Sequence, residues 1–182
     1  ENIALGINDK KLRKDLTANE LRRYIRQVKQ RVTQPVTYAD VWEFWLRNPS
    51  LADEVDFITI HILPYWEDEP IGVDRREADG QLSIEKHLVD IYKKVQARFP
   101  GKKIVIGETG WPSDGRMRSD ARPGRVEQVK YFSIFRGAAE REGFDYNVIE
   151  AFDQYWKARQ EGTVGAEWGL LDAQRHDKFE LG

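Results

Sequence analysis

The chain has 182 residues, of which 40% are apolar and 33% are charged, a mixture typical of one soluble globular domain over residues 1–182 that buries a sizeable core. Its formal net charge of −2 gives no global electrostatic reason to expect nucleic acid or an anionic membrane as a partner. The chain contains no cysteine, which excludes disulfide bonds and thiolate chemistry.

The N-terminal segment predicts a short strand followed by a helix. Residues 3–7 form an apolar run with β-branched side chains at both ends, which favours a strand. Thr17 and Glu20 have the Thr-x-x-Glu spacing of a capping box, which predicts a helix start. We expect the basic residues of this helix on a solvated outer face and favour that interpretation over a phosphate-binding face. The expected buried stripe is Leu21, Tyr24, Ile25, Val28 and Val32.

A strand, a helical segment and a second strand are predicted next. Residues 35–38 favour a short strand, and a Trp-rich helical segment from residue 42 ends near Asn48 and Pro49. Residues 55–63 are almost continuously apolar, as in a strand that is covered on both faces of a parallel sheet. We expect the chain to turn into a loop after this strand.

The second half of the chain continues the alternation. Residues 83–98 have a helical period and are followed by Pro100 and Gly101, two usual helix-stop residues. Residues 103–107 and 146–152 predict strands, and between them a helix is expected to end near Gly143. The expected apolar face of that helix is Val126, Val129, Phe132, Phe135 and Ala139.

This alternation predicts parallel βαβ units, and therefore an α/β fold that is either a (β/α) barrel or an open doubly wound sheet. No Gly-rich phosphate loop follows a strand, and every predicted strand ends in polar or aromatic residues, as at the catalytic end of a TIM-type barrel. A complete barrel takes roughly 250 residues and eight strands, so we expect a partial, half-barrel-like domain of about five βα units. The start without Met, inside an apolar run, suggests N-terminal units beyond this sequence. Open strand edges make a homodimer one expected arrangement.

Glu108 lies in the most informative stretch, residues 106–113, which read Ile-Gly-Glu-Thr-Gly-Trp-Pro-Ser. The stretch puts one carboxylate at a predicted strand end, between small residues and beside a Trp-Pro corner. From spacing alone, a chemical role and a structural role are equally supported, since such a Glu can also cap a helix or pair with Arg.

This stretch resembles the nucleophile motif of glycoside hydrolase family 17, the β-1,3-glucanase-like enzymes. Residues 35–42, 60–66, 151–157 and 161–165 also resemble that family, so the resemblance spans nearly the whole chain. It is closest to the bacterial branch and to the C-terminal portion of the barrel, from the fourth strand onward. The resemblance implies a retaining hydrolase or glucanosyltransferase that acts on β-glucan without a cofactor, and it suggests a periplasmic or extracellular location.

The resemblance implies that Glu108 forms a covalent glucosyl-enzyme while a second carboxyl group, about 5–5.5 Å away, acts as acid and base. The family has an Asn-Glu pair for that second role, and this chain has Asn8 and Asp9 at the corresponding place. The Asp side chain is shorter by about 1.5 Å, and a misplacement of about an ångström can cost on the order of a hundredfold in rate. The alternative is therefore a catalytically impaired glucan-binding or self-associating barrel fragment.

The resemblance also implies a set of substrate-binding residues. A lone His61 is more often an ordinary strand-end residue, but its proximity in sequence to Tyr65 and Trp66 equally supports a sugar subsite. We expect Trp111 to stack on a sugar ring rather than only cover the barrel mouth. Lys157 and Glu161, four residues apart, either pair on a helix or line the glucan cleft, and we favour the cleft. The full expected set is Asn8, Tyr38, His61, Tyr65, Trp66, Trp111, Lys157 and Glu161.

Other kinds of site have little support in the sequence. The three histidines lie in separate predicted elements without metal-ligand spacing, so we expect no metal site. Ser113 lacks the Gly-x-Ser-x-Gly elbow, which argues against a Ser-His triad. Apolar residues nowhere run together for about 18 positions, so no membrane segment is expected in this chain.

Overall fold

The computed structural model describes residues 16–179, which fall into two compact units. Unit 1 comprises the described residues up to Ile62 together with Ile91–Gly107. Unit 2 comprises Leu63–Asp90 together with the described residues from Glu108 onward. Within residues 16–179, no helix is long and apolar enough to cross a membrane.

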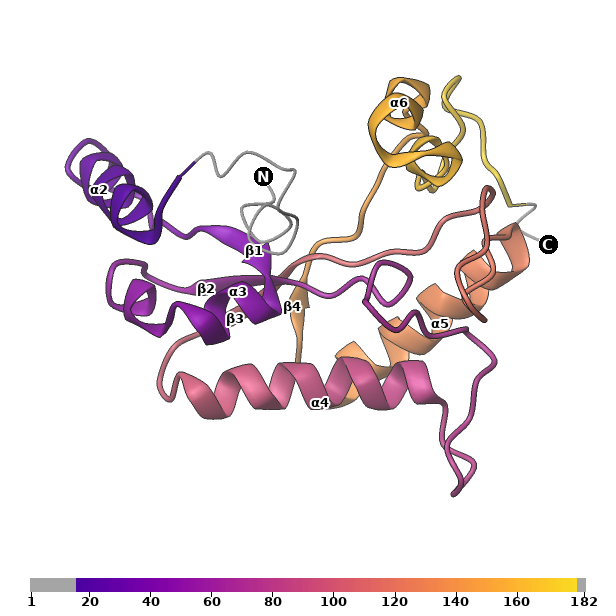
Figure 1. Ribbon diagram of the computed structural model, residues 1–182, viewed down its shortest axis with the longest axis horizontal. Helices are drawn as coiled ribbons and strands as arrows, with labels where there is room; N and C mark the ends of the chain where they lie inside the picture. The colour runs from indigo at the N-terminus through magenta and orange to yellow at the C-terminus, as the bar shows by residue number, and fades with distance from the viewer. Residues whose placement is uncertain (1–15, 180–182) are drawn as a thin grey trace. The chain divides into compact units, whose positions relative to one another are not determined.

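The strands lie in chain order in the sheet, β1-β2-β3-β4. Strands β1 (Ala39–Val41) and β2 (Ile58–His61) are parallel, with Ala39 opposite Thr59 and Val41 opposite His61 (Figure 1). Every residue of β2 is buried, as expected from its continuous apolar run. The remaining strands are β3 (Ile104–Glu108) and β4 (Asp145–Tyr146).

Helices alternate with the strands along the chain. The predicted helix over residues 83–98 has those bounds in the structure, and the predicted capping box of Thr17 and Glu20 is formed. Short 3₁₀ turns cover Pro49–Asp53, Tyr155–Lys157 and Thr163–Ala166. The helices are α2 (Ala18–Lys29), α3 (Trp42–Arg47), α4 (Ser83–Arg98), α5 (Arg125–Glu142) and α6 (Ala158–Glu161).

The predicted buried stripe of α2 is too wide. Leu21 and Ile25 are buried at 5% exposure each, but Tyr24 and Val28 are 45% and 46% exposed. Val32, which lies beyond the end of the helix, is 40% exposed. Helical periodicity identifies the apolar side of a helix, whereas the width of the neighbouring surface decides how many residues on that side are covered.

The buried face of α5 is also rotated from the predicted one. Val126 and Val129 are 63% and 49% exposed, so two of the five expected core positions are wrong. Phe135 and Ala139 are buried as expected. The buried positions of the helix are Gln128, Tyr131, Phe135, Ala138 and Ala139.

Two predicted strands are displaced or shortened. Residues 35–38 precede β1, because Asp56 and the Thr37 hydroxyl supply hydrogen bonds in place of a regular ladder: Val36 N donates to Asp56 Oδ2 at 2.7 Å and Thr37 Oγ1 to Phe57 O at 2.7 Å. The strand expected over 146–152 is reduced to β4, and the backbone after it bonds to loops instead, as in Glu150 N to Trp168 O at 3.1 Å. The strand predicted at residues 3–7 lies outside the described residues.

An aromatic core in unit 1 supports the sheet. Trp45 from α3 has 0% exposure, and its Nε1 donates to Thr59 O of β2 at 2.8 Å. The rings of Phe44, Tyr38 and Phe99 lie 6.2, 6.3 and 6.4 Å from the Trp45 ring. A buried indole with a hydrogen-bonded N–H both fills volume and satisfies its polar atom, so Trp45 fixes α3 on β2.

Candidate active site

Strand β3 ends at Glu108. Ile104 and Ile106 are 3% and 0% exposed, and Glu108, which shares their face by the two-residue period of a strand, is half-buried. A carboxylate at the carboxyl end of a β-strand has the position typical of catalytic groups in (β/α) barrels. The two other residues expected at the reacting bond, Asn8 and Asp9, lie outside the described residues.

Gly107 allows β3 to approach β2 closely, next to His61. A Cβ at position 107 would lie 2.4 Å from Thr59 Cγ2 and 3.4 Å from His61 Cδ2. His61 is 7% exposed. Its imidazole therefore lies beside the backbone of the residue that precedes Glu108.

Replacing Gly107 with alanine is expected to lower the free energy of unfolding by about 1–3 kcal/mol, because the added methyl overpacks the contact with Thr59. Urea titration measures the change. Gly137→Ala in α5 is the matched control: its Cβ would meet only the end of the Arg141 side chain, at 3.2 Å, and a gain of up to about 1 kcal/mol is expected. Equal stability changes in both variants would contradict the close approach.

The loop after Glu108 is anchored within unit 2. Thr109 Oγ1 and the Tyr131 hydroxyl share a hydrogen bond, and burial raises the pKa of Tyr131, which keeps its proton. Trp111 Nε1 donates to Arg122 O at 3.0 Å. Gln128 Nε2 donates to Trp111 O at 2.7 Å. A loop held at Thr109 and Trp111 by α5 and by its own backbone can keep the preceding carboxylate in place.

Ser113, in the same loop, belongs to a buried polar cluster. Lys178 Nζ donates to Ser113 Oγ at 2.6 Å, to Asp153 Oδ1 at 2.6 Å and to Gly169 O at 3.0 Å. The Lys178 and Asp153 side chains are 3% and 2% exposed. Burial, followed by the negative charge of Asp153, raises the pKa of the neighbouring Glu167. Sequence reasoning missed this cluster, because nothing near Lys178 signals a partner that is 65 residues away.

Trp111 is fully buried, with 0% exposure. Its ring lies edge-to-face with Tyr65 at 6.0 Å and stacks with Tyr131 at 5.6 Å. This packing gives Trp111 a supporting role beneath Tyr65. The expected stacking of Trp111 on a sugar stays a prediction, and it would require the Tyr65 or the Tyr131 ring to move away from the Trp111 ring.

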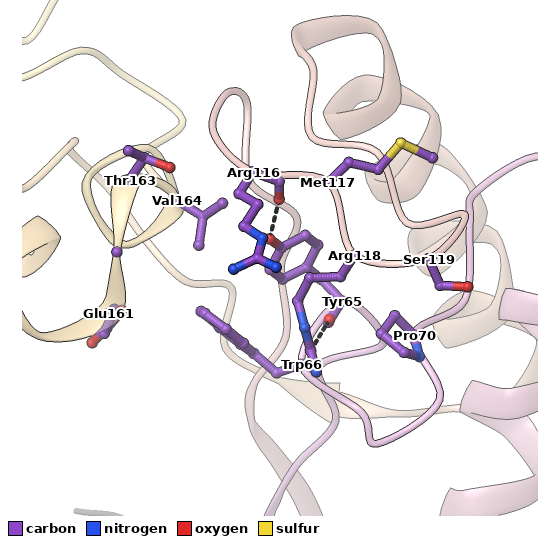
Figure 2. Close-up of a pocket in the computed structure, with 11 residues that line it drawn as sticks. Tyr65, Trp66, Pro70, Arg116, Met117, Arg118, Ser119, Glu161, Thr163 and Val164 are labelled. Atoms are coloured by element: carbon purple, nitrogen blue, oxygen red, sulfur yellow. Dashed lines mark hydrogen bonds between the residues drawn. The ribbon is translucent and has the colours of Figure 1, made fainter.

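Three residues expected to bind substrate meet at one pocket of unit 2. Tyr65, Trp66 and Glu161 line a pocket of about 640 Å³ (Figure 2). Tyr65 is 1% exposed, whereas Trp66 is 37% exposed and stacks on Trp168 at 6.2 Å. The sequence prediction missed the two arginines of this pocket, Arg116 and Arg118. The full lining is Tyr65, Trp66, Pro70, Arg116, Met117, Arg118, Ser119, Glu161, Gly162, Thr163 and Val164.

Lys157 forms an ion pair with Glu150. Its Nζ donates to Glu150 Oε2 at 2.5 Å, with both side chains largely buried at 22% and 11% exposure. Glu150 also accepts a hydrogen bond from Gln154 Nε2. The place of Lys157 in a glucan cleft stays a prediction.

Tyr38 in unit 1 has a buried carboxylate partner that the sequence prediction missed. The Tyr38 hydroxyl donates to Asp40 Oδ2 at 2.8 Å, and Asp40 has 0% exposure. Burial, followed by the charge of Asp40, raises the pKa of Tyr38. The Tyr38 hydroxyl is therefore a proton-retaining donor held by Asp40.

For metal ions, residues 16–179 contain no group of three or more His, Cys, Asp or Glu side chains that could hold one.

Comparison with known proteins gives consistent matches. A family model described as the BtgE/BtgC glycoside hydrolase domain matches residues 3–169. Glucan 1,3-beta-glucosidase BGL2 of Candida albicans is 26% identical over 187 residues, which are 93% of this chain and 59% of that protein. The probable family 17 glucosidase SCW4 of Saccharomyces cerevisiae is 30% identical over 142 residues, which are 76% of this chain and 33% of that protein.

Among solved structures, an active-site mutant of Rhizomucor miehei beta-1,3-glucanosyltransferase in complex with laminaritriose matches with a TM-score of 0.76 at 27% identity. The match covers 90% of this chain and 57% of that one, so the chain spans little more than half of this neighbour. The expected TIM-type barrel class and glycoside hydrolase family 17 are thereby confirmed. The relatives named here are fungal, so the bacterial branch is not confirmed and stays a prediction.

Proposed function

Because this chain belongs to the family of the BtgE/BtgC glycoside hydrolase domain, we propose that Glu108 is the nucleophile of a retaining reaction on β-1,3-glucan, either hydrolysis or glucanosyl transfer. One observation carries the proposal: a half-buried carboxylate ends β3 and leads into a loop anchored through Thr109, Trp111 and Ser113. The names of the relatives, glucan 1,3-beta-glucosidases and a beta-1,3-glucanosyltransferase, support the substrate and the two possible outcomes.

In the proposed reaction Glu108 attacks the anomeric carbon, the glycosidic bond breaks, and Asp9 gives its proton to the leaving oxygen. In the second step Asp9 takes a proton from water or from a sugar hydroxyl, which then displaces Glu108 from the anomeric carbon. Hydrolysis and transfer differ only in this acceptor. The reaction needs no cofactor.

We propose that Asn8, Tyr38, His61, Tyr65, Trp66, Lys157 and Glu161 bind the glucan. Exposure supports Trp66 and Glu161 as direct contacts, since both line the pocket of unit 2. Because Tyr65 and His61 are buried, each would contact the glucan only through a ring edge or a single polar atom. Residues 1–182 would act as one partial barrel domain, and self-association and an exported location stay predictions.

The test is incubation of the purified chain with a soluble β-1,3-glucan. New reducing ends indicate hydrolysis, and products longer than the starting oligosaccharide in mass spectrometry indicate transfer. A fluorinated glucosyl substrate that traps the covalent intermediate should label the peptide that contains Glu108. A label on any other carboxylate would remove Glu108 from the nucleophile role.

The second candidate function is glucan binding without turnover, and the short acid at position 9 favours it. Replacing Asp9 with glutamate is expected to raise turnover by on the order of a hundredfold if the cleft is otherwise intact, because the carboxyl group advances by about 1.5 Å. Reducing-end assays of both forms measure this. Binding of glucan by both forms, with turnover by neither, would instead support the binding module.

A further inference from the structure

The pocket of unit 2 has three walls that come from separate segments of the chain. One wall is aromatic and apolar, with Tyr65, Trp66 and Pro70. The second is the loop 116–119, and the third is the turn 161–164 (Figure 2). Its volume of about 640 Å³ is within the range of small-ligand pockets, roughly 300–1,000 Å³.

The first two walls are held together by reciprocal contacts. The Tyr65 hydroxyl donates to Arg116 O, and Arg118 Nη1 donates to Tyr65 O at 2.5 Å. The Arg118 guanidinium also lies 5.7 Å from the Tyr65 ring centroid and 5.4 Å from that of Trp66. Arg118 therefore has its acceptor and its aromatic neighbours inside the wall, and it fixes the shape of the pocket.

Arg116 differs from Arg118. No carboxylate of residues 16–179 forms an ion pair with Arg116, and its side chain is exposed. In Figure 2 its guanidinium is directed into the space between Val164 and Trp66. Two guanidinium groups and a single carboxylate, that of Glu161, line the pocket, so its lining carries net positive charge.

We propose that this pocket binds an anionic substituent, a carboxylate or a phosphate ester, carried by the glucan, with Arg116 as its ion-pair partner. The proposal rests on the proposed function for the identity of the chain that carries the substituent. A guanidinium matches the paired oxygens of either anion with two parallel hydrogen bonds. Trp66, Pro70 and Val164 provide apolar surface for the adjacent sugar ring.

The test compares the affinity of the full chain for three ligands of matched length: a neutral β-1,3-gluco-oligosaccharide, a carboxymethylated one and a phosphorylated one. Calorimetry should give about tenfold tighter binding of at least one anionic form, as expected for hydrogen bonds to a charged group. Comparison of the carboxymethylated and phosphorylated ligands shows which of the two anionic groups the pocket prefers. The preference should weaken between about 0.01 M and about 0.15 M salt, because the pocket is open to solvent.

Arg116→Gln should bring the ratio of anionic to neutral affinity close to one. Arg136→Gln is the matched control, since Arg136 is an exposed α5 residue paired with Glu140 outside the pocket, and it should keep the ratio. Equal affinity of the wild-type chain for neutral and anionic ligands, or a preference that survives Arg116→Gln, would overturn the proposal.

Glucuronate alone separates this proposal from the proposed function. One outcome is that glucuronate quenches Trp fluorescence in the wild-type chain but not in Arg116→Gln, while the chain neither binds nor cleaves neutral glucan. That result would support the anion site and contradict the proposed function. Turnover of neutral glucan, with equal affinity for neutral and anionic ligands, would support the proposed function and contradict the anion site.

Discussion

Replacing Glu108 with glutamine is expected to lower turnover of β-1,3-glucan by on the order of 10⁴-fold or more while glucan binding persists. The amide has nearly the shape of the carboxylate but cannot form the glucosyl ester. The contacts that hold the following loop come from Thr109, Trp111 and Ser113, so the substitution leaves them in place. Reducing-end rates at saturating glucan and calorimetric affinities measure the two effects separately.

Glu140→Gln is the control for the loss of one carboxylate in unit 2. Glu140 lies on α5 with a side chain 73% exposed, paired with Arg136 at 3.7 Å, and such a pair contributes little to stability. Its replacement should leave turnover within about twofold. A Glu108→Gln chain that retains its rate would transfer the nucleophile role to another carboxylate. If the Glu108 carboxylate is the nucleophile, added azide, a small external nucleophile, should restore cleavage in Glu108→Ala.

Local signals were sufficient for the helices. The capping box of Thr17 and Glu20 and the stop at Pro100 and Gly101 are short-range features, and both helices that they delimit are present. The positions that failed, Val126 and Val129 in α5, depend on which side of the helix other elements cover. Apolarity alone could not decide that, because Gln128 is buried between them with three backbone carbonyl oxygens as acceptors.

In the candidate site, too, local features were predictable from the sequence and features that depend on distant segments were not. The position of Glu108 at the end of β3 was predictable, because the motif that contains it is contiguous in the sequence. Arg116 and Lys178 were not predictable, because each gains its role from residues brought near by folding: the pocket of unit 2 for Arg116, and Ser113 with Asp153 for Lys178. Asp40 lies only two residues from its partner Tyr38, and what the sequence did not reveal is its complete burial. A lysine or arginine in a polar segment has the same local appearance whether it is solvated or buried.

The buried cluster around Lys178 leads to the second large effect. Lys178→Met is expected to lower the free energy of unfolding by about 3–5 kcal/mol, because it leaves the Asp153 carboxylate, 2% exposed, without its cation. Chemical denaturation measures the change. Lys130→Met is the matched control, since Lys130 pairs with Asp74 on the surface of unit 2 and should cost at most about 1 kcal/mol.

A double variant separates the lost ion pair from lost packing. In Lys178→Met with Asp153→Asn, the charge is gone but an amide oxygen can still accept from Gly169 N, which bonds to Asp153 Oδ1 at 2.9 Å. The double variant should therefore be more stable than Lys178→Met alone, with a coupling energy of roughly 1–3 kcal/mol. Additive losses would mean that Lys178 stabilises unit 2 through its aliphatic stem. Lys178 also donates a hydrogen bond to Ser113 in the loop after Glu108. Lys178→Met removes this bond and should loosen the loop, so we expect it to lower turnover more than glucan affinity.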